Sequence, residues 1–504
     1  MMTLGISLSS TPPSRGRPRA FARSALALAG LLALGACTAL APSRPVDAPT
    51  SAKYLEPPPG WMAAAPADTL TRGPWWTLFN DPVLNQFVPQ VAVSNQTVAA
   101  AAAAVEESRA AVREQRAAFF PTLSLNAGVT RSGVGGKKSA SGSSSPSSTG
   151  STSTSSSTGN RLSLGLGASW EPDLWGRIAN TVSAANATAQ ASEADLAAAL
   201  LSAQATFVTD YLSVREADAE VVSLQTTITG FQRSLQITQN RYAAAIAQKS
   251  DVLQAQTQLA NAQADLAQLQ QQRAQLFHAM AVLAGQAPAT FTLPAGDWNS
   301  TAVPALPPGL PSDLLQRRPD IAAAERHVAV ANANIGVARA AYFPSLTLSA
   351  SGNQGASHLG DLFNASSFAW SLGVSLAETI FDGGARTARV EEAQASWKQS
   401  VAQYRQTVLT AFSAVEDQLS AATSLEQQQA LRRFASEAAD QTEQEMQNRY
   451  QQGQVAYTDV VTAQASALSA RRTLMQVSLS RQTAAINMVS ALGGGWSTQQ
   501  LAAE

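Results

Sequence analysis

Side chains able to do chemistry are sparse in this 504-residue chain, and those that stand out recur in one pattern. An arginine–tyrosine pair followed by a hydroxyl residue and an aspartate occurs twice, as Arg241-Tyr242 with Ser250-Asp251 and as Arg449-Tyr450 with Thr458-Asp459. Such groups form ion pairs and hydrogen bonds. No phosphate-binding glycine loop or G-x-S-x-G motif accompanies them, and the histidines lack the spacing of metal ligands (His278, His327 and His358). We therefore predict that the chain is not an enzyme and has no catalytic residue, no metal site and no cofactor.

The single cysteine, Cys37, lies where covalent lipid attachment is expected. Four arginines precede a short apolar run, residues 25–34, which is too short to span a membrane, and Leu34-Gly35-Ala36-Cys37 follows. Small residues before a cysteine at this place resemble a bacterial lipoprotein signal, in which the sulfur receives a diacylglycerol and the new N-terminus an acyl chain. We predict a signal peptide at residues 1–36 and lipidation of Cys37. The alternative is an ordinary signal peptide with a chance cysteine.

The charge balance of the mature chain argues against a nucleic-acid partner. Cleavage after residue 36 removes four of the 34 basic residues and none of the 35 acidic ones, which leaves a net charge of −5. In enteric bacteria an aspartate directly after the lipidated cysteine favours retention in the inner membrane. Thr38 stands at that place here, which permits export to the outer membrane.

An internal duplication places the two arginine–tyrosine pairs. Residues 116–125 return as residues 339–348, an offset of 223, whereas Asn240-Arg241-Tyr242 returns as Asn448-Arg449-Tyr450, an offset of 208. The difference of 15 residues arises between the two markers, where the first repeat has a Ser/Thr/Gly-rich run at residues 137–159. We predict that this run is a flexible loop tip that only the first repeat has.

Each repeat carries two segments that alternate strictly between apolar and small polar residues, which predicts a β-hairpin at residues 122–171 and another at 345–378. Each segment is about ten residues long, as expected of a tilted membrane-spanning strand with lipid on one side and water on the other. Aromatic residues at one end suit an interfacial girdle (Phe119, Phe120, Trp175, Tyr342, Phe343 and Phe381). The alternative is a pair of solvent-facing hairpins on a soluble domain.

Long helices are predicted between the hairpins. A helical pattern covers residues 84–120, and residues 177–245 contain no proline and a single interruption, Gly230. Heptads follow, with one seam at Val252, Leu259, Leu266, Arg273 and Met280 and its copy at Val460, Ala467, Leu474, Arg481 and Met488. A second seam runs at Ala255, Ala262, Leu269, Leu276 and Leu283, with its copy at Ala463, Ala470, Val477, Ala484 and Ala491. Many of the seam residues are small, so we expect closely approaching coiled-coil helices. Even the out-of-place arginine recurs.

Four strands are too few to close a membrane barrel, for which about eight is the minimum. An open edge in lipid leaves backbone groups unpaired. The chain must therefore share its barrel with copies of itself. Two copies give eight strands and three give twelve, and symmetry alone leaves both open.

Several motifs resemble those of the TolC-like outer-membrane factors, within them the NodT/OprM-type efflux lipoproteins. They are Trp170-Glu-Pro-Asp-Leu-Trp-Gly-Arg177, Arg317-Arg-Pro-Asp-Ile321, Arg339-Ala-Ala-Tyr-Phe-Pro-Ser-Leu346 and Phe381-Asp-Gly-Gly384. The resemblance covers essentially the whole mature chain. It implies an α+β membrane protein, a homotrimer with a shared 12-stranded barrel and a periplasmic α-barrel of coiled-coil helices.

The resemblance also divides the chain. A lipidated tether and equatorial segment would occupy residues 37–83, the first repeat 84–285, an equatorial linker 286–316, the second repeat 317–492 and a tail 493–504. The protein would be the outer-membrane channel of a tripartite efflux system. It would carry small-molecule solutes such as drugs, and its partners would be a periplasmic adaptor, an inner-membrane pump of the resistance-nodulation-division type and outer-membrane lipid.

By the same resemblance, the helix-reversal turns form a periplasmic gate of Tyr450, Asp459, Asp251, Arg449, Arg241 and Tyr242. The adaptor would meet the tip at Gly453, Thr458 and Ser250. Gly453 permits a left-handed turn, for which the first repeat has Ala245, and Thr458 is a candidate helix cap. Thr462 and Val455 depart from the family's type member, which has an acid and an arginine there. The alternatives are a structural periplasmic coiled-coil lipoprotein, or an outer-membrane component for metal-ion or type I protein export.

Overall fold

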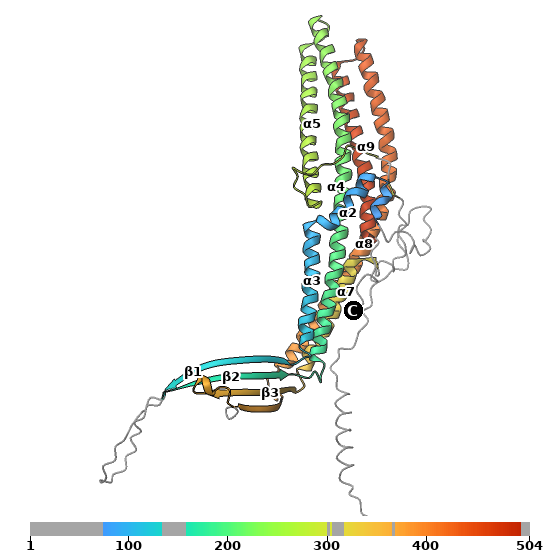
Figure 1. Ribbon diagram of the computed structural model, residues 1–504. Coiled ribbons are helices and arrows are strands. Elements are labelled where there is room, and N and C mark those ends of the chain that lie inside the picture. Colours follow the sequence, from blue (N-terminus) through green and yellow to red (C-terminus); the bar gives the residue numbers. More distant parts are fainter. Residues whose placement is uncertain (1–73, 134–157, 300–302, 305–316, 365–367, 495–504) are drawn as a thin grey trace, which may run out of the picture. The chain divides into compact units, whose positions relative to one another are not determined.

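The computed structural model describes residues 74–133, 158–299, 303–304, 317–364 and 368–494 (Figure 1). The predicted signal peptide, Cys37 and all but the last two residues of the run 137–159 lie outside these ranges. The described residues fall into two compact units, each built from both repeats. The first unit contains residues 114–183 and 332–394, and the second contains residues 74–113, 184–331 and 395–494, in their described parts.

The first unit holds a four-stranded antiparallel sheet in the order β1-β2-β3-β4. The strands are β1 (Thr122–Gly133), β2 (Thr158–Trp170), β3 (Ser345–Ala356) and β4 (Phe368–Ala377). Both predicted hairpins are therefore present, and β2 pairs with β3 to join them into one sheet. Within the described residues β1 and β4 each pair on one side only, so the sheet has two open edges.

The register gives this sheet one apolar and one polar face. Leu125 lies opposite Leu166, Ala168 opposite Ala350 and Ala350 opposite Leu372, and cross-strand partners point to the same side. On the other side Ser124 lies opposite Gly167, Gly167 opposite Ser351 and Ser351 opposite Ser371. The apolar side chains are exposed, for example Leu125 at 70% and Leu372 at 75%. An exposed apolar surface that runs across four strands indicates contact with lipid or another apolar partner.

The predicted aromatic girdle needs one correction. Phe120 and Phe381 are exposed as expected. Trp175 and Phe343 instead stack on each other with ring centroids 4.9 Å apart, and the Trp175 indole Nε1 donates to the Pro344 carbonyl oxygen at 2.6 Å. This pair joins the two hairpins at their bases. The indole N–H is bonded within the protein, so Trp175 does not act as a girdle residue.

Seven α-helices are described: α2 (Pro82–Ser94), α3 (Gln96–Ala117), α4 (Arg177–Ala243), α5 (Lys249–Leu283), α7 (Pro319–Ala340), α8 (Ala385–Gln451) and α9 (Tyr457–Ala491). In the second unit α4, α5, α8 and α9 run side by side, and both helix-reversal turns lie at the same end (Figure 1). Among the described residues, none of the helices combines the length and apolarity needed to cross a membrane.

The heptad seams form the helix contacts as predicted. Ala255, Ala262 and Leu269 on α5 are buried, as are Val460, Ala467 and Met488 on α9. The main apolar cluster lies farther from the turns, where Phe87 and Val91 of α2 and Phe291 pack on Phe207 of α4. These segments cover one face of the long helices.

The two out-of-place arginines are explained by a duplicated ion pair. Arg273 on α5 pairs with Asp218 on α4, and the Arg481 Nη2 on α9 lies 3.4 Å from Glu426 Oε1 on α8. The two acids are themselves 208 residues apart, so the duplication carried both partners. Each pair links the two long helices of its own repeat.

The predicted helix over residues 84–120 is in fact two helices, because the chain breaks at Asn95. The Asn95 Oδ1 accepts from the backbone N–H of Thr97 at 2.9 Å and of Val98 at 3.1 Å, which caps α3. Its Nδ2 donates to the Leu283 carbonyl at 3.0 Å, at the end of α5. The start of one helix is thus tied to the end of another.

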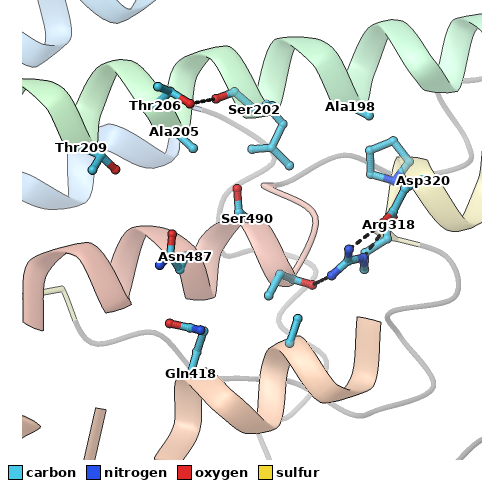
Figure 2. Close-up of a pocket in the computed structure, with 14 residues that line it drawn as sticks. Ala198, Ser202, Ala205, Thr206, Thr209, Arg318, Asp320, Gln418, Asn487 and Ser490 are labelled. Atoms are coloured by element: carbon cyan, nitrogen blue, oxygen red, sulfur yellow. Dashed lines mark hydrogen bonds and ion pairs between the residues drawn. The ribbon is translucent and has the colours of Figure 1, made fainter. Parts of the chain in front are cut away.

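The second repeat has the same joint with a different residue. Arg318 corresponds to Asn95 and Ala491 to Leu283, and the Arg318 Nη1 donates to the Ala491 carbonyl at 3.0 Å. The rest of the guanidinium forks onto Asp320, at 3.0 and 2.6 Å (Figure 2). These residues line a pocket of about 490 Å³ whose other walls are mostly small residues of α4, α8 and α9. Arg318 makes the contact between the helices, and Asp320 neutralises and orients it. We therefore assign the Arg-Arg-Pro-Asp motif to this joint.

Candidate functional site at the helix-reversal turns

The two reversal turns end their helices in the same way. After α8 the N–H of Gln454 donates to the Arg449 carbonyl and that of Gly453 to the Tyr450 carbonyl, both at 2.9 Å. After α4 the same two bonds run from Ile246 to Arg241 and from Ala245 to Tyr242. This is the Schellman pattern, which needs a left-handed residue. Gly453 has φ +77°, as predicted, and Ala245 has φ +56° in spite of its side chain.

The predicted capping by Thr458 is wrong. Helix α9 begins at Tyr457, so Thr458 already lies in the first turn, and the backbone N–H of Ala456 donates to Asp459 Oδ2 at 3.2 Å. In the first repeat the N–H of Gln248 donates to Asp251 Oδ2 at 3.4 Å. Both aspartates thus reach back from the third helical position to the residue before the helix, where a negative charge is favoured.

An arginine of the first repeat holds the last turn of α8 in the second. The Arg241 Nη1 donates to the Tyr450 carbonyl at 2.7 Å, and its Cζ lies 4.5 Å from the centroid of the Tyr450 ring. A cation over an aromatic face contributes about 0.5–1 kcal/mol at a partly exposed site. Arg241 therefore attaches one turn to the other through both charge and ring contact.

Tyr450 and Tyr457 form the apolar floor of this contact. Their ring centroids lie 5.2 Å apart, and both pack against Ala255 and Val460. Burial raises the pKa of Tyr457 to about 12, with a smaller contribution from Tyr450, so the hydroxyl stays protonated. The Tyr450 hydroxyl is buried and has no hydrogen-bond partner among the described residues.

The other predicted gate residues do not join this cluster within one chain. Tyr242 is 48% exposed, and the Arg449 Nε pairs with Glu445 Oε1 at 2.8 Å on its own helix. Asp251 and Asp459 are occupied at the helix starts. Sequence reasoning missed Tyr457, although a signal was present: it stands in the turn motif where the first repeat has Lys249. Gly453, Thr458 and Ser250 are exposed at the tip.

The arrangement can hold two turns together and release them, because every contact in it is non-covalent. It places cations and rings at the shared end of α4, α5, α8 and α9. Nothing in it activates a nucleophile.

Comparison with known proteins gives consistent matches over nearly the whole chain. A family model described as outer membrane efflux protein matches residues 87–286 and 310–494. The probable efflux pump outer membrane protein TtgC of Pseudomonas putida is 31% identical over 92% of this chain and 94% of its own length. The cation efflux system protein CusC of Escherichia coli is 31% identical over 85% of this chain and 90% of its own. The solved structure of the outer-membrane channel OprN has a TM-score of 0.79 at 28% identity and covers 91% of this chain and 99% of its own.

Proposed function

This chain belongs to the outer membrane efflux protein family, and from that premise we propose how it assembles and how its channel is gated. It is the outer-membrane channel component of an efflux pump, with a periplasmic helical part, and it is not an enzyme. The structural coiled-coil lipoprotein considered as an alternative is excluded. Its fold is TolC-like, with four antiparallel strands and long helices in two repeats.

The assembly we propose is a homotrimer with a barrel of twelve strands. The observation that carries it is the sheet with an exposed apolar face, a polar opposite face and two open edges. In lipid these edges need partners, since each unpaired backbone group costs several kcal/mol. The resemblance to trimeric channels favours three copies over two. The apolar face then meets lipid and the serine- and glycine-rich face lines water.

Neighbouring residues of β4 test this orientation. Leu372 lies on the apolar face and Ser371 on the polar face. We expect Leu372→Asp to impair membrane insertion, because a charged side chain on the lipid face is destabilising. Ser371→Asp should insert and shift the ion selectivity of the channel. Equal insertion of both variants, measured by detergent extraction of outer membranes and by conductance in lipid bilayers, would contradict the assignment of the faces.

The gate we propose lies at the reversal turns, with Arg241 and Tyr450 as its main contact and Tyr457 as its floor. The other predicted gate residues contribute to the gate through neighbouring subunits or by shaping the turns (Asp251, Asp459, Arg449 and Tyr242). The support is the Arg241 contact with Tyr450, which joins helices of different repeats at the tip. Opening separates these turns.

Arg241→Gln tests the gate, with Arg233→Gln as its control two turns away on an exposed part of α4. We expect Arg241→Gln to raise single-channel conductance in planar bilayers and to increase drug permeability of cells, whereas Arg233→Gln leaves both unchanged. Tyr450→Phe combined with Asp459→Ala is a second test. If conductance and permeability are unaltered by both, the turns are not the gate.

We further propose that the exposed tip, including Gly453, Thr458 and Ser250, receives a periplasmic adaptor, and that an inner-membrane pump supplies the energy. TtgC is named as part of an efflux pump and CusC as part of a cation efflux system. For this chain we favour small-molecule cargo, since seven methionines and three histidines in 504 residues give no indication of a metal-lined route.

Lipidation of Cys37 is proposed as an auxiliary anchor, since the barrel itself holds the protein in the membrane. Mass spectrometry of the mature N-terminus tests the modification. Cys37→Ser behind a cleavable non-lipoprotein signal tests its role, and we expect most channel function to remain. Complete loss of membrane insertion would show that the lipid is essential.

A further inference from the structure

A partly buried charge cluster lies between the repeats, well away from the tip: Glu220 is buried, whereas the Arg472 and Asp265 side chains are 36% and 41% exposed. Arg472 of α9 donates from Nε to Glu220 Oε1 on α4 at 2.5 Å, and its Nη1 lies 3.5 Å from Asp265 Oδ2 on α5. The Glu220 side chain is only 7% exposed. Helix α9 belongs to the second repeat and α4 and α5 to the first. Arg472 therefore joins the two repeats inside one subunit.

The neighbouring arginine makes a different kind of contact. Arg471 pairs with Asp440 at 2.7 Å and with Glu443 at 2.8 Å, and both acids lie on α8 of its own repeat. Arg472 also has no copy in the first repeat, where the corresponding residue is Ala264. The Arg472 cluster is thus specific to the contact between repeats.

A third carboxyl group, Glu216, stands one turn from Glu220 on α4. It is buried, at 7% exposure, and its Oε1 has no hydrogen-bond partner among the described residues. The charged groups that face it are Glu220 from its own helix and Arg472 from α9, and Asp265 of α5 faces the other side of Arg472. Burial, with repulsion from Glu220, raises the pKa of Glu216 to about 7, while Arg472 acts in the opposite direction.

An apolar layer next to the cluster keeps water away from one side. Leu224, Ile228 and Phe231 of α4 pack there with Ala262 of α5 and Leu468 of α9. A charge pair in such surroundings is screened less than one at the surface. Separating α9 from α4 would admit water to Glu216 and would break the bonds of Arg472.

We propose that Arg472 is a positioning residue for channel opening, which together with Glu220 and Asp265 holds α9 against the first repeat, and that this arrangement, stabilised by a proton on Glu216, is the closed state of the channel. The proposal rests on the function of the chain as a channel that opens by helix movement. It does not depend on the residues of the tip.

The direction of the pH effect follows from linkage. If Glu216 regains its ordinary pKa near 4.5 when α9 moves away, the closed arrangement binds the proton more tightly than the open one. Acid then favours the closed arrangement, and this preference is lost as the pH rises through 7. Between pH 8 and pH 5 the ratio of closed to open should increase by about seventyfold for each Glu216.

The test is open probability of the full-length protein in planar bilayers between pH 5 and pH 8. We expect wild type to open more as the pH rises, and Glu216→Gln to stay at the low, acid level throughout. Arg472→Gln should open more at every pH, and Arg472→Lys should restore closure in large part. Arg471→Gln is the matched control and should follow wild type.

Two results would overturn the proposal. One is a pH profile of Glu216→Gln that equals that of wild type, which decides the matter even if Arg472→Gln fails to assemble. The other is an opening by Arg471→Gln as large as that by Arg472→Gln, because the effect would then be general loss of packing on α9. If Arg241→Gln opens the channel while the Arg472 and Glu216 variants behave as wild type, the proposed gate at the tip is supported and only the proposed role of the Arg472 cluster fails.

Discussion

Ala245 pays a conformational penalty that its counterpart Gly453 avoids. Both residues end a long helix in the left-handed region, at φ +56° and +77°. A side chain there costs about 1–2 kcal/mol. We expect Ala245→Gly to raise the free energy of unfolding by about 1 kcal/mol, offset in part by the greater freedom of glycine in the unfolded chain. The measurement is thermal unfolding in detergent.

Gly453→Ala is the reciprocal variant, and it should lower stability by a similar amount. The space around Gly453 is open, with the Arg241 guanidinium 4.0 Å from an added Cβ, so backbone strain is the main term. Stabilisation by both substitutions would contradict the explanation.

Predictions about helix ends were made from neighbouring residues alone. They were correct where only one residue could take the required conformation. Gly453 stood in a turn motif, and a left-handed glycine was the simple solution. Thr458 was assigned to the helix cap because a hydroxyl residue preceded an aspartate. The chain instead starts the helix earlier, and Asp459 reaches back from the third position. Adjacent capping residues leave that choice open, and the turn geometry decides it.

At the scale of elements, the duplicated joint is the feature most sensitive to a single methyl group. A Cβ at Gly493 would lie 2.1 Å from the Arg317 carbonyl oxygen, and one at Gly285 would lie 2.1 Å from that of Ser94. We expect Gly493→Ala to cost about 3 kcal/mol or more, from strain together with displacement of the helix start. Loss of folded protein or a large fall in Tm would show it.

Gly384→Ala provides the control for that variant. Gly384 also has a positive φ, +93°, but an added Cβ would meet no heavy atom within 4 Å. Its cost should be limited to backbone strain, about 1 kcal/mol. If the two variants unfold alike, close approach at the joint is not the cause.

The strands and coiled-coil helices could be predicted from the sequence because the spacing of their apolar residues itself determines which face is buried. Alternation gave both hairpins, and the heptads gave the seams of α5 and α9. The break at Asn95 was not foreseen, because the apolar spacing continues on both sides of it. Asn95 acquires its role only from the Leu283 carbonyl, 188 residues away, and such a partner exists only in the folded chain.

For the whole molecule, we expect stability to fall as the pH rises from 5 to 8. Burial raises the pKa of Glu216 to about 7 and that of Asp210 to about 6, so the folded state binds these protons more tightly than the unfolded state. The resulting stabilisation is fully present below the ordinary carboxyl pKa and is lost as the pH passes through 6 to 7. For Glu216 its size is on the order of 1–2 kcal/mol after allowance for solvent screening.

Thermal unfolding of wild type and of Glu216→Gln across this pH range measures that contribution. The variant should unfold at a temperature that depends less on pH. A Tm that rises with pH in wild type would contradict the assignment, since it would require carboxyl groups that release protons on folding.

Subunit number was the part of the molecule that residues alone left open. Four strands exclude closure by one chain, but eight and twelve are both acceptable counts. Three copies remain our proposal, based on the resemblance to the TolC-like channels, because contacts between subunits leave no periodic signal within one sequence.

The open sheet edges have a consequence for how the protein is made. In the assembly proposed above, a newly exported subunit carries an apolar face and two unpaired strands through an aqueous compartment before it meets its partners. Such a surface is a template for wrong pairing with any other extended chain. We therefore expect the sheet to need a chaperone that covers it until it inserts into the membrane.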